Sequence, residues 1–301
     1  MRSHRLRAAA GGGGLDDSAY SGFFTSGASP ISIVNTSADF FAGNSNTTHN
    51  GKGVFYDHSE GKIFASWNTA SSYAWSNGGS TYSGNANFYS PSGSQTNLAG
   101  HTSSGIGSTG SDITVAYLGD NTPVFVAVSA SNARFYYFNY PSGTYIGYQD
   151  FTTGTSNNPT NANTRGVCYS GTHLITLNNS DFALYGYDIP ASTASISSNT
   201  ISTTRKWSSG NNASNSNGLV WTGNGVIQGY TNTYSAISHW AATNIVLSGS
   251  GYTGSHTQTA FYYITSSNAT GVPNYSIGMD YKNRKLIIGG YDNDRYAVYG
   301  E

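Results

Sequence analysis

The densest group of side chains that could perform chemistry is the run Asp-His-Ser-Glu at residues 57–60. A histidine between carboxylates can bind a metal ion or transfer protons. The run separates two apolar segments, at residues 53–57 and 62–66, and Gly61 follows it. Asp and Gly in such a place are typical of a tight turn. We therefore interpret the run as a turn between two strands.

Enzyme chemistry has little support elsewhere in the chain. Glycoside hydrolysis needs two carboxyl groups that face each other, yet the only glutamates are Glu60 and the terminal Glu301. The aspartates that follow apolar runs lie near expected turns, namely Asp57, Asp120, Asp188 and Asp280. The seven histidines are scattered without metal-ligand spacing, and Gly-rich runs such as 105–107 lack the helix of a phosphate loop. We predict a non-enzymatic protein with no catalytic residue, metal or cofactor.

Aromatic residues offer a different chemistry. The chain has 5 Trp and 24 Tyr, whose rings can stack on sugars, and its abundant Asn, Ser and Thr can bind hydroxyl groups. Most of these rings are expected to pack in the core. Trp75 and Tyr82 are our candidates for exposed, glycan-binding rings, because they lie in a Gly/Ser-rich segment at 68–84.

These residues belong to a repeating pattern. Residues 132–143, Asn-Ala-Arg-Phe-Tyr-Tyr-Phe-Asn-Tyr-Pro-Ser-Gly, have weaker copies at 85–93 and 182–192. Apolar runs of four to eight residues, divided by Gly, Asn and Ser, predict β-strands, and no segment has a convincing helical period. A recurring strand-and-turn unit indicates a repeat architecture.

The repeat contains four expected strands. First strands begin near residues 53, 113, 166, 218 and 276, at spacings of 60, 53, 52 and 58. Second strands are expected at 62–66, 124–128, 173–177, 226–230 and 285–289. Third strands are expected at 87–90, 134–140, 182–189, 236–241 and 295–299. Fourth strands are expected at 95–99, 144–151, 201–207 and either 245–248 or 260–265.

This pattern predicts an all-β fold, a β-propeller of five four-stranded blades. The last repeat has no fourth strand before the chain ends, and an unassigned strand lies near residues 30–41. We expect that amino-terminal strand to close the propeller, because closure protects sheet edges. Six blades, or a β-sandwich, are the structural alternatives.

Composition restricts the partners. Charged residues are only 9% of the chain and the net charge is −1, so a nucleic-acid partner is not expected. No apolar run approaches the ~20 residues of a membrane span, so membrane insertion is not expected either. The single cysteine, Cys168, lies in an apolar strand and is interpreted as a core residue.

Residues 1–22 form a separate segment. They contain Arg2, Arg5, Leu6 and Arg7, followed by four glycines at 11–14. We expect a flexible anchoring arm at 1–22 and the propeller at 23–301. A disordered tail is the alternative for the arm.

Two resemblances to known families add to these expectations. The start of the arm, Met-Arg-Ser-His-Arg-Leu-Arg-Ala-Ala-Ala-Gly-Gly, resembles that of tailed-phage virion proteins of the tail, fibre or appendage type. The five repeats resemble the architecture of five-bladed tachylectin-type lectins. The first resemblance implies a virion structural protein, assembled in the host cytoplasm, whose residues 1–22 dock on other virion proteins. The propeller would then decorate the particle or contact host surface glycans. A free glycan-binding lectin is the second hypothesis, and a glycoside hydrolase the third.

Overall fold

The computed structural model is made of β-strands, and the residues that it describes include no α-helix. It describes residues 110–129, 133–140, 144–153, 159, 164–178, 180–181 and 183–208, together with strands elsewhere in the chain. A single 3-10 turn, Thr193–Ser195, interrupts the strands of this part. Within the same residues, no helix has the length and apolar character that crossing a membrane requires.

The strands form four sheets. The first contains β2 (Asn50–Asp57), β3 (Lys62–Thr69), β4 (Ser72–Asn77) and β5 (Gln95–Asn97). The second contains β6 (Gly110–Tyr117), β7 (Pro123–Ser129), β8 (Arg134–Asn139), β9 (Tyr145–Phe151) and the short edge strand β13 (Thr200–Ile201).

The third sheet has eight strands. In spatial order they are β10 (Thr164–Tyr169), β11 (His173–Asn178), β12 (Ala183–Asp188), β14 (Arg205–Ser208), β18 (Gly254–Ile264), β17 (Ile237–Ser248), β16 (Gly225–Tyr234) and β15 (Ser216–Trp221). The pair β14–β18 is parallel, so two four-stranded units are joined along their outer strands. The fourth sheet contains β19 (Asn274–Asp280), β20 (Lys285–Gly290), β21 (Arg295–Gly300) and, antiparallel to β21, β1 (Ser32–Asn35).

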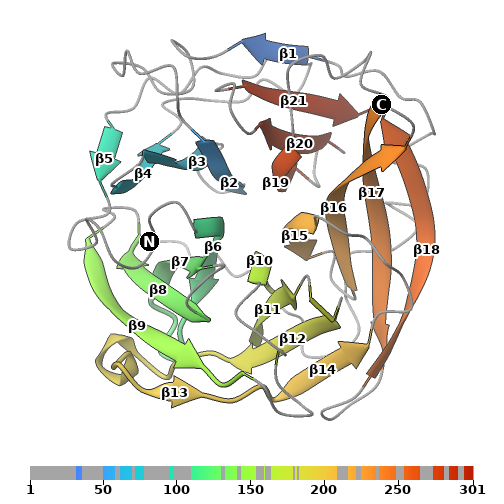
Figure 1. The fold of residues 1–301 in the computed structure, drawn as a ribbon. Coiled ribbons are helices and arrows are strands. Elements are labelled where there is room, and N and C mark those ends of the chain that lie inside the picture. The colour runs from blue at the N-terminus through green and yellow to red at the C-terminus, as the bar shows by residue number, and fades with distance from the viewer. Residues whose placement is uncertain are drawn as a thin grey trace.

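The innermost strands contact one another in a cycle. The contacting pairs are β2 with β6, β6 with β10, β10 with β15, β15 with β19, and β19 with β2. The remaining strands of each unit lie progressively farther from the centre (Figure 1). The arrangement is therefore propeller-like, as the repeats predict, and differs from two stacked sheets.

The strand predictions are largely confirmed, with errors among the third and fourth strands. Every predicted first and second strand is present, as β2, β6, β10, β15 and β19 and their hairpin partners. The third strand of the first repeat is β4, which pairs with β3, and not residues 87–90, which lie outside the described residues. The Gly and Ser residues around β4 hid its alternation of Tyr73 and Trp75 with small residues.

In the third and fourth repeats, the position of the fourth strand was also not determined by the sequence alone. The predicted strand at 201–207 is divided, because Thr200–Ile201 pairs with β9 and Arg205–Ser208 pairs with β12. In the next unit, residues 245–248 belong to the third strand, β17, and most of 260–265 to the fourth, β18.

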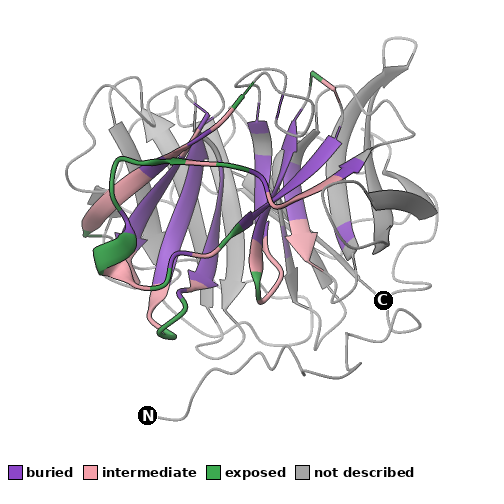
Figure 2. Cartoon of the chain, turned by 90° about the horizontal axis from the view of Figure 1, so that it is seen from below, coloured by how far each residue is buried: buried purple, intermediate pink, exposed green. Residues whose placement is uncertain are grey.

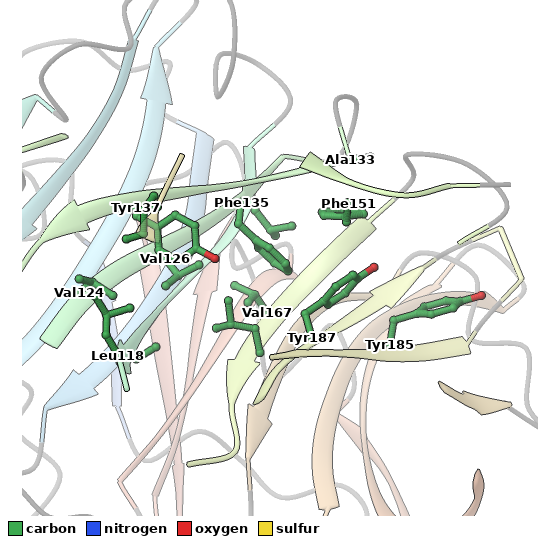
Figure 3. Close-up of a cluster of buried hydrophobic side chains, with 14 of the residues drawn as sticks. Leu118, Val124, Val126, Ala133, Phe135, Tyr137, Phe151, Val167, Tyr185 and Tyr187 are labelled. Atoms are coloured by element: carbon green, nitrogen blue, oxygen red, sulfur yellow. The ribbon is translucent and has the colours of Figure 1, made fainter. Parts of the chain in front are cut away.

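The core lies between the sheets. Strands β7 and β11 are buried along almost their whole length, since both faces of their sheets are covered (Figure 2). Val126, Phe135 and Tyr137 of the second sheet pack with Val167 and Tyr187 of the third (Figure 3). The ring centroids of Phe135 and Tyr187 lie 5.2 Å apart. Burying each such side chain contributes roughly 2–3 kcal/mol of stability.

The connection at residues 189–204 runs along the outside of the second sheet, and we call it the strap (Figure 2). Asp150 N–H donates to Asn199 O at 3.0 Å, and Thr152 N–H to Ile201 O at 2.9 Å. Ile196, a residue of the strap, is buried in the core cluster. The strap therefore covers the β9 edge, which would otherwise present unpaired backbone groups.

Candidate binding surface

One face of the β6–β9 sheet becomes more exposed toward its outer strand. Its inner rows are buried, and comprise Ile113, Val115, Phe125, Ala127, Tyr136 and Phe138. The tyrosines packed against them are only half-buried, namely Tyr140, Tyr145 and Tyr148. The opposite face packs on the sheet of β10. The face with the half-buried tyrosines is therefore turned toward the sheet of β2–β5, whose strands β2 and β3 contact β6.

An ion pair lies at the outer corner of this face. Arg134, at the start of β8, lies directly opposite Asp150 of β9 in the strand register. Its Nε donates to Oδ1 at 2.5 Å and its Nη2 to Oδ2 at 3.1 Å. The two side chains are 24% and 34% exposed. The hydrogen bonds to Asp150 raise the pKa of Arg134, so its guanidinium stays charged and fixed in direction.

Two of the half-buried tyrosines pack against buried aromatic rings. Tyr145 packs on Phe138 with centroids 5.6 Å apart, and Tyr140 on Phe125 at 5.0 Å. The guanidinium carbon of Arg134 lies 3.8 Å from the ring centroid of Tyr148, a cation–π contact. Burial is the main cause that raises the pKa of Tyr145, so its hydroxyl is a neutral donor at physiological pH.

We name this group of residues the β9 rim; it consists of Arg134, Tyr140, Tyr145, Tyr148 and Asp150. It offers fixed, partly exposed rings beside a carboxylate. Rigid aromatic faces with a few placed polar groups are characteristic of binding sites for small organic ligands. The rim can therefore stack on a sugar ring and accept hydrogen bonds from its hydroxyl groups.

A second polar group joins the first turn of the third sheet to β12. Thr172 Oγ1 lies 2.7 Å from His173 Nδ1, and His173 Nε2 lies 3.3 Å from Asp188 Oδ1. The order hydroxyl, imidazole, carboxylate is that of nucleophilic catalysis. However, His173 and Asp188 are direct partners in the β11–β12 register, and Ser170 and Thr172 bond within the hairpin turn. Burial lowers the pKa of His173, and this group is explained as a turn and a cross-strand pair.

A third group lies where β12 begins. The Tyr185 hydroxyl donates to Asp181, and Lys206 Nζ lies 3.8 Å from Asp181 Oδ2 and 5.1 Å from the Tyr185 ring centroid. Asp181 Oδ1 also accepts the Ala183 N–H at 3.2 Å. Burial, and then the bond to Asp181, raise the pKa of Tyr185, so its phenol remains a protonated donor. These contacts fix the start of β12.

Metal binding and thiol chemistry have no support in the same part of the chain. Among the described residues, no three His, Cys, Asp or Glu side chains gather as metal ligands would. Cys168 is a buried free thiol, as predicted. Burial, and then the charge of Asp112, raise the pKa of Cys168 well above its ordinary value, so it is a poor nucleophile.

The predicted site residues occupy other places. Trp75 lies on β4, opposite Ser66 and Thr96, in the sheet next to the β9 rim. Tyr82 lies outside the described residues, and so do the arm residues Arg2, Arg5, Leu6 and Arg7. The residues of the rim were not selected from the sequence. Their signal was the spacing Tyr145, Tyr148, Asp150 after the aromatic run, but only pairing places Arg134 opposite Asp150.

Comparison with known proteins shows similarity of fold alone. No protein-family model and no curated protein matches this sequence. The Myxococcus xanthus glutaminyl cyclase structure is similar at 12% identity and a TM-score of 0.50, over 84% of this chain and 90% of that one. A Chaetomium thermophilum Polycomb Repressive Complex 2 chain matches at 7% identity and a TM-score of 0.48, over 90% and 97% of the two chains. The first similarity agrees with a propeller-like fold and transfers no activity at that identity.

Proposed function

We propose that the protein is a non-enzymatic, glycan-binding protein on a β-propeller of five four-stranded blades, closed by β1. The cyclic contacts of the five inner strands support the number of blades. The antiparallel pairing of β1 with β21 supports the closure, since it joins the amino-terminal part of the chain to the last unit. In this arrangement the eight-stranded sheet is two blades.

The observation that carries the function is the β9 rim. Its half-buried tyrosines rest on buried rings, and the Arg134–Asp150 pair lies beside them. The chain has few charges, with a formal net charge of −1. A neutral partner rich in hydroxyl groups suits such a surface better than a polyanion or a basic protein. Host surface glycans belong to that class.

The proposed setting is a phage particle, in which residues 1–22 dock on another virion protein and the propeller faces outward. Its support is the resemblance of the amino terminus to tailed-phage virion proteins. A free lectin is the alternative, since the β9 rim would serve it equally well. Mass spectrometry of purified particles separates the two settings, because only the first places the protein in the particle.

Glycan binding is tested by a glycan array, followed by calorimetry of each saccharide found. Tyr145→Ala should weaken binding by up to about tenfold, because a stacking ring contributes roughly 0.5–1.5 kcal/mol. Trp75→Ala tests the residue predicted from sequence on the neighbouring sheet.

Tyr169→Ala is the matched control. Tyr169 is also a half-buried tyrosine, but it packs against the core cluster on the other face of the second sheet. Its substitution should leave affinity unchanged. Absence of any saccharide ligand, or equal losses in Tyr145→Ala and Tyr169→Ala, would contradict glycan binding at the rim.

A further inference from the structure

The charges of the β9 rim compensate each other. Arg134 and Asp150 are its two charged residues, and two hydrogen bonds join their side chains. The strap, which pairs with β9 through Thr200 and Ile201, has no charged residue between positions 189 and 204. Within these described residues, an anionic ligand therefore finds no cation other than the compensated Arg134.

The guanidinium of Arg134 is directed at its own partners. Its Nε and Nη2 both donate to Asp150, and its central carbon lies 3.8 Å from the ring centroid of Tyr148 and 5.7 Å from that of Tyr136. Guanidinium groups bind the carboxylate or phosphate of a ligand through such a pair of donors. Here Asp150 occupies that pair, so Arg134 is poorly placed to bind an acidic ligand.

Asp150, in contrast, has acceptor capacity beyond its bonds to Arg134. A carboxylate has roughly four positions for accepting hydrogen bonds, and Arg134 donates to two of them. The Asp150 side chain is 34% exposed, whereas Asp112 of the same sheet is buried. On its outer side Asp150 lies opposite Thr200, which is exposed and neutral. Asp150 can therefore accept further hydrogen bonds from a ligand.

The hydroxyl groups of a sugar are donors that suit this carboxylate. Tyr148 lies two residues before Asp150 on β9, so its ring and the carboxylate share one face of the sheet. A sugar that stacks on an aromatic ring of this face can donate from its hydroxyl groups to Asp150. A carboxylate or sulfate group on the sugar cannot donate, and Asp150 repels its charge. Placing like charges together is one way in which binding sites exclude wrong partners.

We propose, on the basis of the glycan-binding function proposed above, that Asp150 determines the specificity of the β9 rim. It accepts hydrogen bonds from the hydroxyl groups of a neutral saccharide and excludes saccharides that carry a carboxylate or sulfate group. Arg134 is a positioning residue, because its two hydrogen bonds fix the direction of the Asp150 carboxylate.

The test is an array of paired saccharides, in which each neutral saccharide is printed beside its sialylated or sulfated form, as lactose beside sialyllactose. The full chain should bind neutral members and leave their acidic forms unbound. Asp150→Asn keeps the size of the side chain and removes its charge. It should weaken the binding of neutral members about tenfold or more, because hydrogen bonds to a charged group are the stronger class.

The deciding readout is the binding of the acidic members by Asp150→Asn. It should increase, since Arg134 then carries an uncompensated positive charge and the repelling carboxylate is gone. A residue with a merely structural role would not produce this gain, because damage to the rim weakens the binding of both classes.

Asp188→Asn is the matched control. Asp188 is an exposed aspartate at the end of β12, where it pairs with His173 in the third sheet. Its substitution should alter the binding of neither class. A thermal melt establishes that each variant is folded, and the preference of the unchanged chain between paired saccharides decides if Asp150→Asn is not.

Failure of this specificity and failure of glycan binding give different results. Equal binding of neutral and acidic members by the unchanged chain, or an Asp150→Asn variant that gains no acidic member, would overturn the role of Asp150 while glycan binding stands. If the unchanged chain binds no saccharide of the array, the proposed function is contradicted, and the role of Asp150 with it.

Discussion

Gly166 shows how closely the inner strands approach one another. A β-carbon there would lie 2.9 Å from Leu219 Cγ and 3.2 Å from the Leu219 backbone nitrogen, on the neighbouring inner strand. Only a residue without a side chain fits at that distance. The glycine that begins this repeat in the sequence is therefore explained by the close approach of two inner strands.

Hydrogen bonds between polar side chains connect the core to the strap. The Tyr137 hydroxyl donates to Gln149 Oε1 at 2.8 Å, and Gln149 Nε2 donates to Asn199 Oδ1 at 3.1 Å. Tyr137 lies in the main cluster, while Asn199 belongs to the strap. A phenol buried in this way must stay protonated to remain a donor.

Stability should fall in alkaline solution. Burial raises the pKa of Tyr137 and Tyr187 above the ordinary 10.0, and that of Cys168 above 9.0. Above these ordinary values the unfolded chain loses protons that the folded chain keeps. The free energy of unfolding is therefore intact below about pH 8 and falls with rising pH, by roughly 1.4 kcal/mol per unit and group.

Urea unfolding between about pH 8 and pH 11 measures this fall. Cys168→Ala should remove its earliest part, near the ordinary pKa of a thiol, 9.0, and leave the later part due to the tyrosines. A stability that stays constant over this range would show that these side chains are not buried as described.

At the scale of elements, the strap explains how an outer strand is protected. It follows β12 of the third sheet, yet residues 190 and 191 accept the N–H groups of Gly119 and Asp120 in the second. Farther on it pairs with β9 through β13. An uncovered outer edge would invite pairing with another chain. The strap thus joins two sheets and blocks that pairing.

Ile196→Ala should loosen the strap selectively. Ile196 is 8% exposed, and its removal should cost about 2–3 kcal/mol, near the lower limit for a buried isoleucine. The amides of Asp150 and Thr152, which donate to the strap, should exchange faster in hydrogen-exchange mass spectrometry. The amides between β7 and β8 should keep their protection.

Ser198→Ala, at an exposed strap position, is the control and should change neither stability nor exchange. If Ile196→Ala accelerates exchange equally throughout the second sheet, the strap and the sheet open as one unit and the proposed protection of an edge is wrong.

At the scale of the whole molecule, both ends of the strand order meet in the fourth sheet. β1 pairs with β21 from Ser32 opposite Val298 to Asn35 opposite Arg295. If this pairing closes a propeller, the arm and the closing strand have separate roles. β1 then serves stability, and residues 1–22 are left for the docking role that we propose.

Two truncations separate these roles. A chain that lacks residues 1–22 should melt within a few degrees of the full chain, because β1 is retained. A chain that lacks residues 1–40 should melt roughly 10 °C lower or aggregate, since the β21 edge is exposed. Differential scanning fluorimetry with light scattering measures both effects. Equal melting of the two truncated chains would contradict closure by β1.

The sequence by itself determined the class of structure and most strands. Short apolar runs divided by Gly, Asn and Ser are local signals, so the hairpins of β6–β7 and β10–β11 could be placed from residues alone. The expectation that most aromatic rings pack in the core also holds for the aromatic run, since Phe135 to Phe138 are buried. Cys168 was placed in the core for the same reason.

The tertiary structure decided everything that depends on pairing between distant segments. The strap joins Asn199 to Asp150, and Gly166 of β10 lies against Leu219 of another unit. The β9 rim arises because register places Arg134 opposite Asp150. No local pattern records such contacts, since they depend on how the units pack around the centre and not on the period of any one strand.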